Sequence, residues 1–271
     1  MTGTRKTRVL MVAGQPQVVV KIDRRAPGAH VAFLTVDNPA KLNALSSAVM
    51  DAFVATVEQL WKDEALRVLV VTGAGHRAFI GGADIDEMAR LDIASARAFI
   101  TRVHRCCEAL RNLPVPVIAR IDGYTLGAGL ELAAACDLRV ATDSAQFGMP
   151  EVRLGMPSVV EAALLPTLVG WGHAREMLLL GEIVTAQEAA RWGLIERVVP
   201  ADGLDQAVER WIQALLSAEP RAVRLQKMLI RKWEKLPLND AIQAGIDCFV
   251  TAFESDEPRR AIAKFRARRK P

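Results

Sequence analysis

The stretch from Gly123 to Glu151 constrains this chain more than any other part of the sequence. A turn of small residues, Gly127 to Gly129, leads into a short apolar helix expected from Leu130 to Cys136, and this helix contains Glu131. A β-like segment and a turn then lead to Glu151. A carboxylate in apolar surroundings costs several kcal/mol unless it is paired, and no Lys or Arg lies beside Glu131 in the sequence. The pattern therefore predicts a site that needs both acids.

The composition predicts a folded protein with a large core. The chain has 271 residues, of which 51% are hydrophobic and 24% are charged. It can therefore bury enough apolar surface for one large domain, or for one domain with a helical extension. The net charge of +4 is small, but seven basic residues and no acid follow from Arg259 to the end. That cationic end suits phosphate groups or a solvated helix face.

The cysteines and the N-terminus indicate a cytoplasmic protein. Cys106, Cys107, Cys136 and Cys248 have neither metal-ligand spacing nor a disulfide pattern, so we expect reduced thiols and no metal. The apolar run from Val9 to Ala13 is too short for a signal peptide core or a membrane span. We interpret the basic N-terminus as a frayed tail, and a short mitochondrial presequence is the alternative.

Strands alternate with helices up to about residue 150, which favours an α/β core. The glycine-rich stretch from Gly73 to Met88 is expected to be a loop. The expected strands are Val18–Ile22 and Val31–Val36, which form a hairpin, and Arg67–Thr72, Val115–Ile121 and Leu138–Thr142; the expected helices among them are Ser47–Lys62, capped by Ser46, and Ala94–Leu110.

The rest of the chain is expected to be almost entirely helical. Thr185 and Glu188 form a capping-box pattern at the start of one helix. Several helices are apolar on more than one side, which predicts packing against another subunit. The expected helices are Val160–Val169, His173–Leu180, Ala186–Trp192, Asp202–Ser217, Arg221–Trp233, Asn239–Phe253 and Pro258–Arg268.

Six motifs follow one another along nearly the whole chain. They are NPAKLNALS (38–46), AFIGGADIDEM (78–88), PVPVIARIDGYTLGAGLELAAACD (114–137), FGMPEVRLGMPS (147–158), GEIVTAQEAARWGLIERVV (181–199) and AIAKFRARRKP (261–271). In this order they resemble the motifs of the crotonase superfamily, the enoyl-CoA hydratase/isomerase family. Six ordered motifs are far more specific than any one of them.

The resemblance implies a fold, a substrate class and an assembly. The fold would be an α/β spiral of ββα units over residues 1–200, followed by an α-helical oligomerisation region over residues 201–271. The substrate would be an acyl-CoA thioester, with no separate cofactor because coenzyme A is part of the substrate. The assembly would be a homotrimer or a homohexamer (a dimer of trimers). We expect neither a nucleic acid nor a membrane as a partner.

The resemblance also assigns catalytic groups residue by residue. Glu131 and Glu151 would be the two catalytic glutamates, and the backbone amides of Ala83 and Ala128 would form an oxyanion hole. Adding water to a 2-enoyl thioester places negative charge on the thioester oxygen, and losing one fixed donor to such an oxygen typically costs ~3–4 kcal/mol. We expect Glu151 to exchange the C2 proton and Glu131 to orient and activate the water, and the sequence leaves open which is the acid and which the base.

Further residues of the same motifs would bind the substrate. By the resemblance, Phe265 and Arg268 would contact the adenine and phosphates of CoA, from a neighbouring subunit in many members. The complete expected set is Lys41, Leu42, Gly81, Gly82, Asp84, Ile85, Gly127, Pro150, Ser158, Phe265 and Arg268.

The chain departs from the common family pattern at three places. Ala128 stands where many hydratases have glycine, which adds a methyl group but keeps the N–H. Asp86 stands where many have lysine, which removes a charge that would face phosphate. Residues 157–161 (PSVVE) replace a Pro-Gly-Ala-Gly-Gly turn and place a third acid, Glu161, near the expected acyl pocket. We expect Glu161 to be structural and to pair with an arginine.

Other functions fit the sequence less well. A Δ3-Δ2 isomerase commonly needs only one glutamate, so the pair favours hydration, while CoA-ester hydrolases, decarboxylases and racemases of the same fold stay open. A non-catalytic RNA-binding or scaffold protein would suit the basic end, but aromatic residues do not interleave with it. The segment Gly73–Ala78 fits the dinucleotide pattern G-x-G-x-x-A, which is weak evidence without a long helix after it. The four histidines have no metal-ligand spacing and are expected to be structural.

Overall fold

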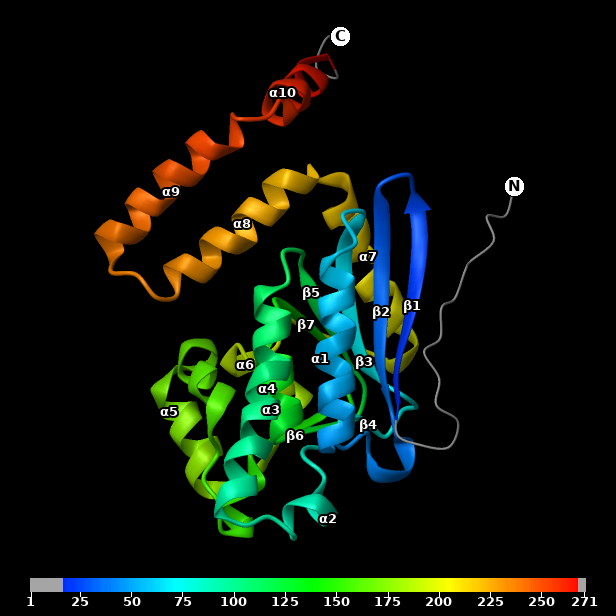
Figure 1. Ribbon diagram of the computed structural model, residues 1–271, viewed down its shortest axis with the longest axis vertical. Coiled ribbons are helices and arrows are strands. Elements are labelled where there is room, and N and C mark those ends of the chain that lie inside the picture. The colour runs from blue at the N-terminus through cyan, green and yellow to red at the C-terminus, as the bar shows by residue number, and fades with distance from the viewer. Residues whose placement is uncertain (1–16, 268–271) are drawn as a thin grey trace.

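The computed structural model describes residues 17–267, and a six-stranded sheet forms the centre of the fold (Figure 1). Its order is β1-β2-β3-β5-β7-β10. The first two strands form the predicted antiparallel hairpin, and every later pair is parallel. The central strands are apolar along most of their length because both of their faces are covered. The strands are β1 (Gln17–Ala26), β2 (Ala29–Asp37), β3 (Leu66–Gly73), β5 (Val117–Ile121), β7 (Leu138–Thr142) and β10 (Arg197–Val199).

A second, four-stranded sheet confirms the expected spiral. Each of β3, β5 and β7 in the large sheet is followed along the chain by a short strand of the small one, so the chain repeats the same turn. The small sheet has the order β4 (Ala78–Ile80), β6 (Tyr124–Leu126), β8 (Gln146–Gly148) and β9 (Ile183–Thr185).

The sequence did not predict these short strands, because three residues are too few to show an alternating pattern. The expectation that residues 73–88 form a loop was wrong in part, because this stretch contains β4 and the short helix α2 (Ile85–Met88). Ala78 opens a strand rather than a helix. The G-x-G-x-x-A match therefore lacks the strand-to-helix turn that holds a dinucleotide.

Helices cover both faces of the large sheet. One face packs against α1 (Ser47–Trp61), α3 (Ile93–Asn112) and α4 (Ala128–Ala135), with Phe53, Phe79 and Phe147 among the fully buried side chains. The predicted N-cap of α1 is present, because Oγ of Ser46 accepts a hydrogen bond from Val49 N. On the opposite face, α7 (Leu204–Ser217) packs its apolar side chains against β2, β3, β5 and β7.

The segment after β8 is mostly helical as expected, but part of it is 3₁₀ helix rather than α-helix. Residues predicted as the helix Val160–Val169 form the 3₁₀ helix η3 (Val160–Leu164) and the start of α5 (Leu165–Leu180). The predicted break before His173 is at Gly170, where φ is 74°. The capping box of Thr185 and Glu188 starts α6 (Ala186–Trp192). The remaining 3₁₀ turns are η1 (Pro39–Lys41), η2 (Pro150–Leu154) and η4 (Ala201–Gly203).

Three C-terminal helices form an arm that extends from the body of the subunit (Figure 1). They are α8 (Pro220–Trp233), α9 (Leu238–Ala252) and α10 (Glu257–Ala267). The buried Lys227 joins α8 to the body, because its Nζ donates to Leu110 O, Val115 O and Asp137 Oδ2. The division at residue 200 into a core and an oligomerisation region stays a prediction. Within residues 17–267, no helix is both long enough and apolar enough to cross a membrane.

Candidate active site

The small sheet brings the two predicted oxyanion-hole segments together. Strands β4 and β6 are adjacent and parallel, so the chain leaves both at the same edge, toward Ala83 and Ala128 respectively. The segments pack so closely that a Cβ on Gly82 would lie 3.3 Å from Leu126 O, and a Cβ on Gly129 only 2.0 Å from Ile80 O. Glycine at these positions permits this contact of backbone with backbone.

The amides of Ala83 and Ala128 are unpaired donors. In the described part of the chain neither N–H donates a hydrogen bond to a protein acceptor. Ala128 is the first residue of α4, where helix geometry leaves the amides without an internal acceptor. Ala83 lies in a parallel bridge with Leu45, in which Leu45 N donates to Gly82 O and Asp84 N donates to Leu45 O, so that the N–H of Ala83 takes no part in it. Two such donors, one of them at the start of a helix, can hold an anionic oxygen.

Glu131 lies one turn into α4 and is 4% exposed. Its Oε1 accepts a hydrogen bond from the Ala162 amide at 3.1 Å. Burial raises the pKa of Glu131 to about 8, the Ala162 bond opposes this rise, and the negative charges of Glu151 and Glu161 add to it. Glu131 is therefore mainly protonated at neutral pH.

Glu151 lies in the first turn of η2, directly after Pro150, and faces the start of α4. Its Oε2 accepts a hydrogen bond from Ser158 Oγ at 2.8 Å. Its Oε1 lies over Gly127, where an added Cβ would come within 2.4 Å. Gly127 also has φ 51°, so this position needs glycine for both its conformation and its space. Because Gly127 precedes Ala128, the Glu151 carboxyl lies beside the unpaired amide.

The predicted residues of the first two motifs lie at the rim of this site. The Gly81 amide donates to Leu42 O at 2.8 Å, which joins the two loops. Nζ of Lys41 lies 3.1 Å from Oδ2 of Asp84 and 2.7 Å from Oδ2 of Asp86, and these acids raise the pKa of Lys41. Asp86, which departs from the family pattern, therefore offsets the positive charge of Lys41 at the rim of the site. The neighbouring Ile85 is exposed.

One predicted residue is not at this site in the single chain, and another lies outside the described residues. Phe265 is on α10, at the end of the molecule opposite α2, which follows Ala83 (Figure 1). Arg268 lies outside the described residues.

The expectation that Glu161 pairs with an arginine was wrong, because its Oε1 lies 2.8 Å from Nδ1 of His104 on α3. No sequence pattern indicated this pair or the Ala162 amide, since both arise when η3 packs onto α3 and α4.

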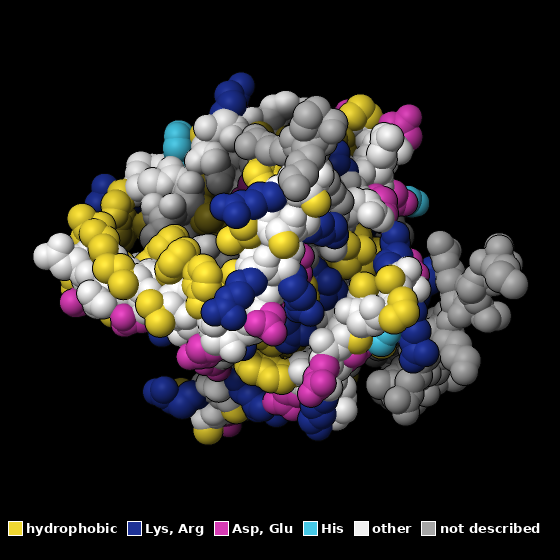
Figure 2. All heavy atoms as spheres, turned by 90° about the horizontal axis from the view of Figure 1, so that it is seen from above, with side chains coloured by type: hydrophobic (Ala, Val, Ile, Leu, Met, Phe, Trp, Pro, Cys, Tyr) yellow, Lys and Arg dark blue, Asp and Glu magenta, His cyan; other side chains and the backbone are white. Residues whose placement is uncertain are grey.

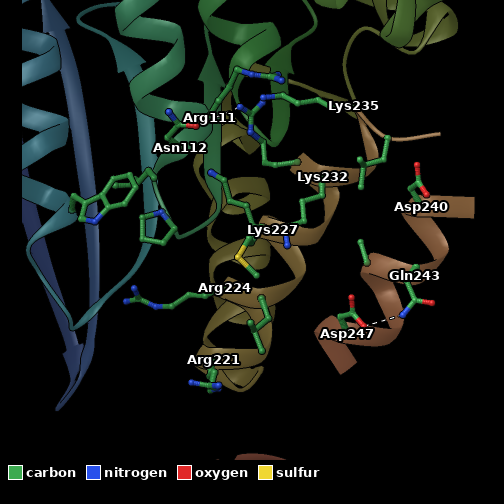
Figure 3. Close-up of a pocket in the computed structure, with 18 residues that line it drawn as sticks. Arg111, Asn112, Arg221, Arg224, Lys227, Lys232, Lys235, Asp240, Gln243 and Asp247 are labelled. Carbon is green, nitrogen blue, oxygen red and sulfur yellow. Dashed lines mark hydrogen bonds between the residues drawn. The ribbon is translucent and has the colours of Figure 1, made fainter. Parts of the chain in front are cut away.

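A separate cavity of about 920 Å³ lies between α8, α9 and the ends of α1 and α3 (Figure 3). None of the predicted catalytic residues lines it. Much of its positive charge is paired, since Lys227 contacts Asp137, Arg111 and Arg231 contact Glu234, and Arg221 contacts Glu254. The two glutamates and the two unpaired amides lie elsewhere, next to the small sheet and the start of α4. The cavity lining includes Arg111, Arg221, Arg224, Lys227, Arg231, Lys232 and Lys235.

Comparisons with known proteins agree with the motifs. Residues 27–271 match the family model described as enoyl-CoA hydratase/isomerase. A short-chain-enoyl-CoA hydratase from Clostridium acetobutylicum is 32% identical over 241 residues, which are 89% of this chain and 92% of the relative. A crotonyl-CoA hydratase from Syntrophomonas wolfei is 33% identical, over 89% of this chain and 93% of its own.

The structural comparison gives the same result. A crystal structure of an enoyl-CoA hydratase from Bacillus anthracis superposes with a TM-score of 0.87 at 31% identity, covering 93% of this chain and 97% of the other. Family match, sequence relatives and structural neighbour all extend over most of the chain. The chain therefore belongs to the enoyl-CoA hydratase/isomerase family.

Proposed function

We propose that this protein is an enoyl-CoA hydratase, which reversibly adds water across the 2,3-double bond of a 2-enoyl-CoA thioester. One observation carries the proposal: the amides of Ala83 and Ala128 have no protein acceptor in the described chain and lie on segments that pack together, the Glu151 carboxyl lies over Gly127, and the charge of Glu151 acts on Glu131 one turn further along α4. The amides fit the oxygen that becomes negative as an enolate, and the acids fit the proton transfers. Relatives named as hydratases of short enoyl-CoA and crotonyl-CoA support this substrate class.

The two glutamates are proposed to work with one proton between them. The pKa of about 8 for Glu131 keeps one proton in the pair at neutral pH. A water bonded to both carboxyls can pass that proton to Glu151, because water donates and accepts at once. Glu131 then takes a proton as the water oxygen bonds to C3, and Glu151 gives its proton to C2. The enolate charge returns to the carbon as the C2–H bond forms, and the pair again holds one proton.

The test is an assay with crotonyl-CoA and longer enoyl-CoA esters, following the loss of absorbance of the conjugated thioester. We expect hydration by the unaltered protein and a fall of several orders of magnitude in Glu151→Gln, since the variant cannot exchange the C2 proton. Glu58→Gln, on the exposed side of α1, is the control and should retain full activity. Conversion of a 3-enoyl-CoA without hydration of any 2-enoyl-CoA would replace the proposal with an isomerase.

We also propose that the subunits assemble into a homotrimer or a homohexamer through the C-terminal arm. Hydrophobic side chains gather over this arm at the left of Figure 2. Ile242, Ile246 and Phe249 on α9 and Phe253 at its C-cap are exposed at spacings that place them on one face of the helix. A neighbouring subunit would cover them and could bring Phe265 and Arg268 to a CoA site. Light scattering should give three or six times the 29.6 kDa chain mass.

The proposed location is the cytoplasm. Cys106, Cys107 and Cys136 are buried free thiols, and Cys248 is also free. Such thiols suit a reducing compartment, where acyl-CoA thioesters also occur in solution.

A further inference from the structure

A third buried acid, Glu161, lies near the proposed catalytic pair. It is the second residue of η3, is 8% exposed, and its Oε1 contacts Nδ1 of His104 at 2.8 Å. Its Oε2 is buried and has no hydrogen-bond partner among the residues that the structure describes. A buried carboxylate costs several kcal/mol unless it is fully paired. Packing alone therefore does not account for an acid at this position.

The backbone next to Glu161 is strained. Val160 has φ 40°, a value that β-branched residues rarely adopt, and no side chain caps the start of η3. Strained backbone persists only where its surroundings hold it. Two side-chain hydrogen bonds tie this turn to neighbouring helices within the described chain: that of Glu161 with His104 on α3, and that of the Ala162 amide with Glu131 on α4. The Ala162 N–H is shared, since it also donates to Val159 O within the turn at 2.9 Å.

We propose that His104 and Glu161 are positioning residues, which anchor the strained start of η3 to α3 so that the Ala162 amide stays on Oε1 of Glu131. The inference rests on the proposed function, because it assigns the two residues to holding a hydratase glutamate. Neither is a catalytic residue in this scheme. The contact acts through one peptide unit, since Glu161 and Ala162 are adjacent in the chain.

The charge of Glu161 has a second effect on the same acid. Glu151 on η2 and Glu161 on η3 both add to the rise in the pKa of Glu131 that burial causes. From α3, the Cys107 thiol is close to both Glu131 and Glu161, and burial raises its pKa well above the usual value and keeps it neutral. Glu108 approaches only the outer side of His104, at 3.9 Å from Nε2.

The experiment compares three variants with the unaltered protein. Glu161→Gln keeps the size of the side chain and removes its charge, and Glu161→Leu removes both the charge and the bond to His104. Glu108→Gln is the matched control, because it removes an exposed acid from the other side of the same imidazole. The readouts are kcat and KM for crotonyl-CoA, the pH profile of kcat/KM, and hydrogen–deuterium exchange of the peptide that contains Ala162.

In the unaltered protein we expect kcat/KM to fall above a pH of about 8, where the pair loses its proton. In Glu161→Gln this fall moves to lower pH, because a negative charge near Glu131 is gone. In Glu161→Leu we expect kcat to fall about 10- to 100-fold at nearly constant KM, as small displacements of a reacting group cost this much. In the same Glu161→Leu variant, hydrogen–deuterium exchange at Ala162 becomes faster. Glu108→Gln leaves all four readouts unchanged.

A folded Glu161→Leu variant with unchanged kcat, pH profile and exchange would overturn the assignment. Loss of thermal stability with normal kcat per folded subunit would do the same, since it would show a purely structural pair. If the unaltered protein hydrates no enoyl-CoA, the proposed function fails. The exchange comparison still tests the anchor in that case, because it needs no turnover.

Discussion

The Ser158 hydroxyl donates a hydrogen bond of 2.8 Å to Oε2 of Glu151, seven residues earlier in the chain. This bond holds the carboxyl that also lies over Gly127. The resemblance assigned Ser158 to substrate binding, and the contact adds that this side chain can position a catalytic acid.

Ser158→Ala is therefore expected to lower kcat about tenfold, because a hydrogen bond to a charged group contributes about 1.5–3 kcal/mol. KM should change little. The measurement is steady-state hydration of crotonyl-CoA. Ser217→Ala, an exposed serine at the end of α7, serves as the comparison and should behave like the unaltered protein. An unchanged kcat in Ser158→Ala would show that Glu151 keeps its place without this bond.

Gly127→Ala is expected to abolish most of the activity. The new Cβ would meet Oε1 of Glu151 at 2.4 Å, and the residue would keep φ 51° and ψ −123°, a backbone conformation that glycine adopts far more readily than an L-residue. Gly28→Ala is a matched control, since Gly28 has φ 71° in the turn between β1 and β2 and nothing lies within 4 Å of its Cβ position. Both variants should lose stability in urea unfolding, because each places a side chain at positive φ, and only Gly127→Ala should lose kcat. Equal activity in the two would rule out displacement of Glu151.

Glu131 makes a pH-dependent contribution to stability. Its pKa in the folded protein, about 8, lies above the usual value of 4.5, so the folded state binds more protons than the unfolded state between these pH values. Stability contributed by the neutral acid is therefore lost as pH rises from about 4.5 to about 8. Glu131→Gln stays neutral and escapes this loss. Differential scanning fluorimetry measures the melting temperatures of both proteins. We expect the melting temperature of Glu131→Gln to rise relative to that of the unaltered protein as the pH increases from 5 to 8. A constant difference would mean that Glu131 titrates normally.

Lys227→Met is expected to weaken the attachment of α8. The substitution leaves Leu110 O, Val115 O and Asp137 without their ammonium donor in a mostly buried place. Breaking a buried ion pair from one side costs about 3–5 kcal/mol. Urea unfolding measures the loss, with Lys232→Met on the exposed side of α8 as the reference. A loss below about 1 kcal/mol would indicate that solvent or relaxation replaces the three bonds.

The long strands and helices could be predicted from sequence. Apolar runs such as residues 67–72 and capping patterns such as Thr185 with Glu188 are local signals, and the structure confirms both. The three-residue strands of the small sheet could not be predicted, because pairing with distant strands creates them. The assignments of Ala83, Ala128 and the two glutamates stay predictions, supported by free amides and by the contacts at Gly127.

The sequence by itself determined the alternation of strands and helices, the positions of the two glutamates and the family pattern, because these depend on residue type and on short spacings. Only the tertiary structure decided that burial raises the pKa of Glu131 and that Ser158 donates a hydrogen bond to Glu151. It also decided that Glu161 pairs with His104, where an arginine was expected. Burial and partner choice depend on which distant segments pack together, and the packing of η3 on α3 and α4 is not encoded in any local pattern.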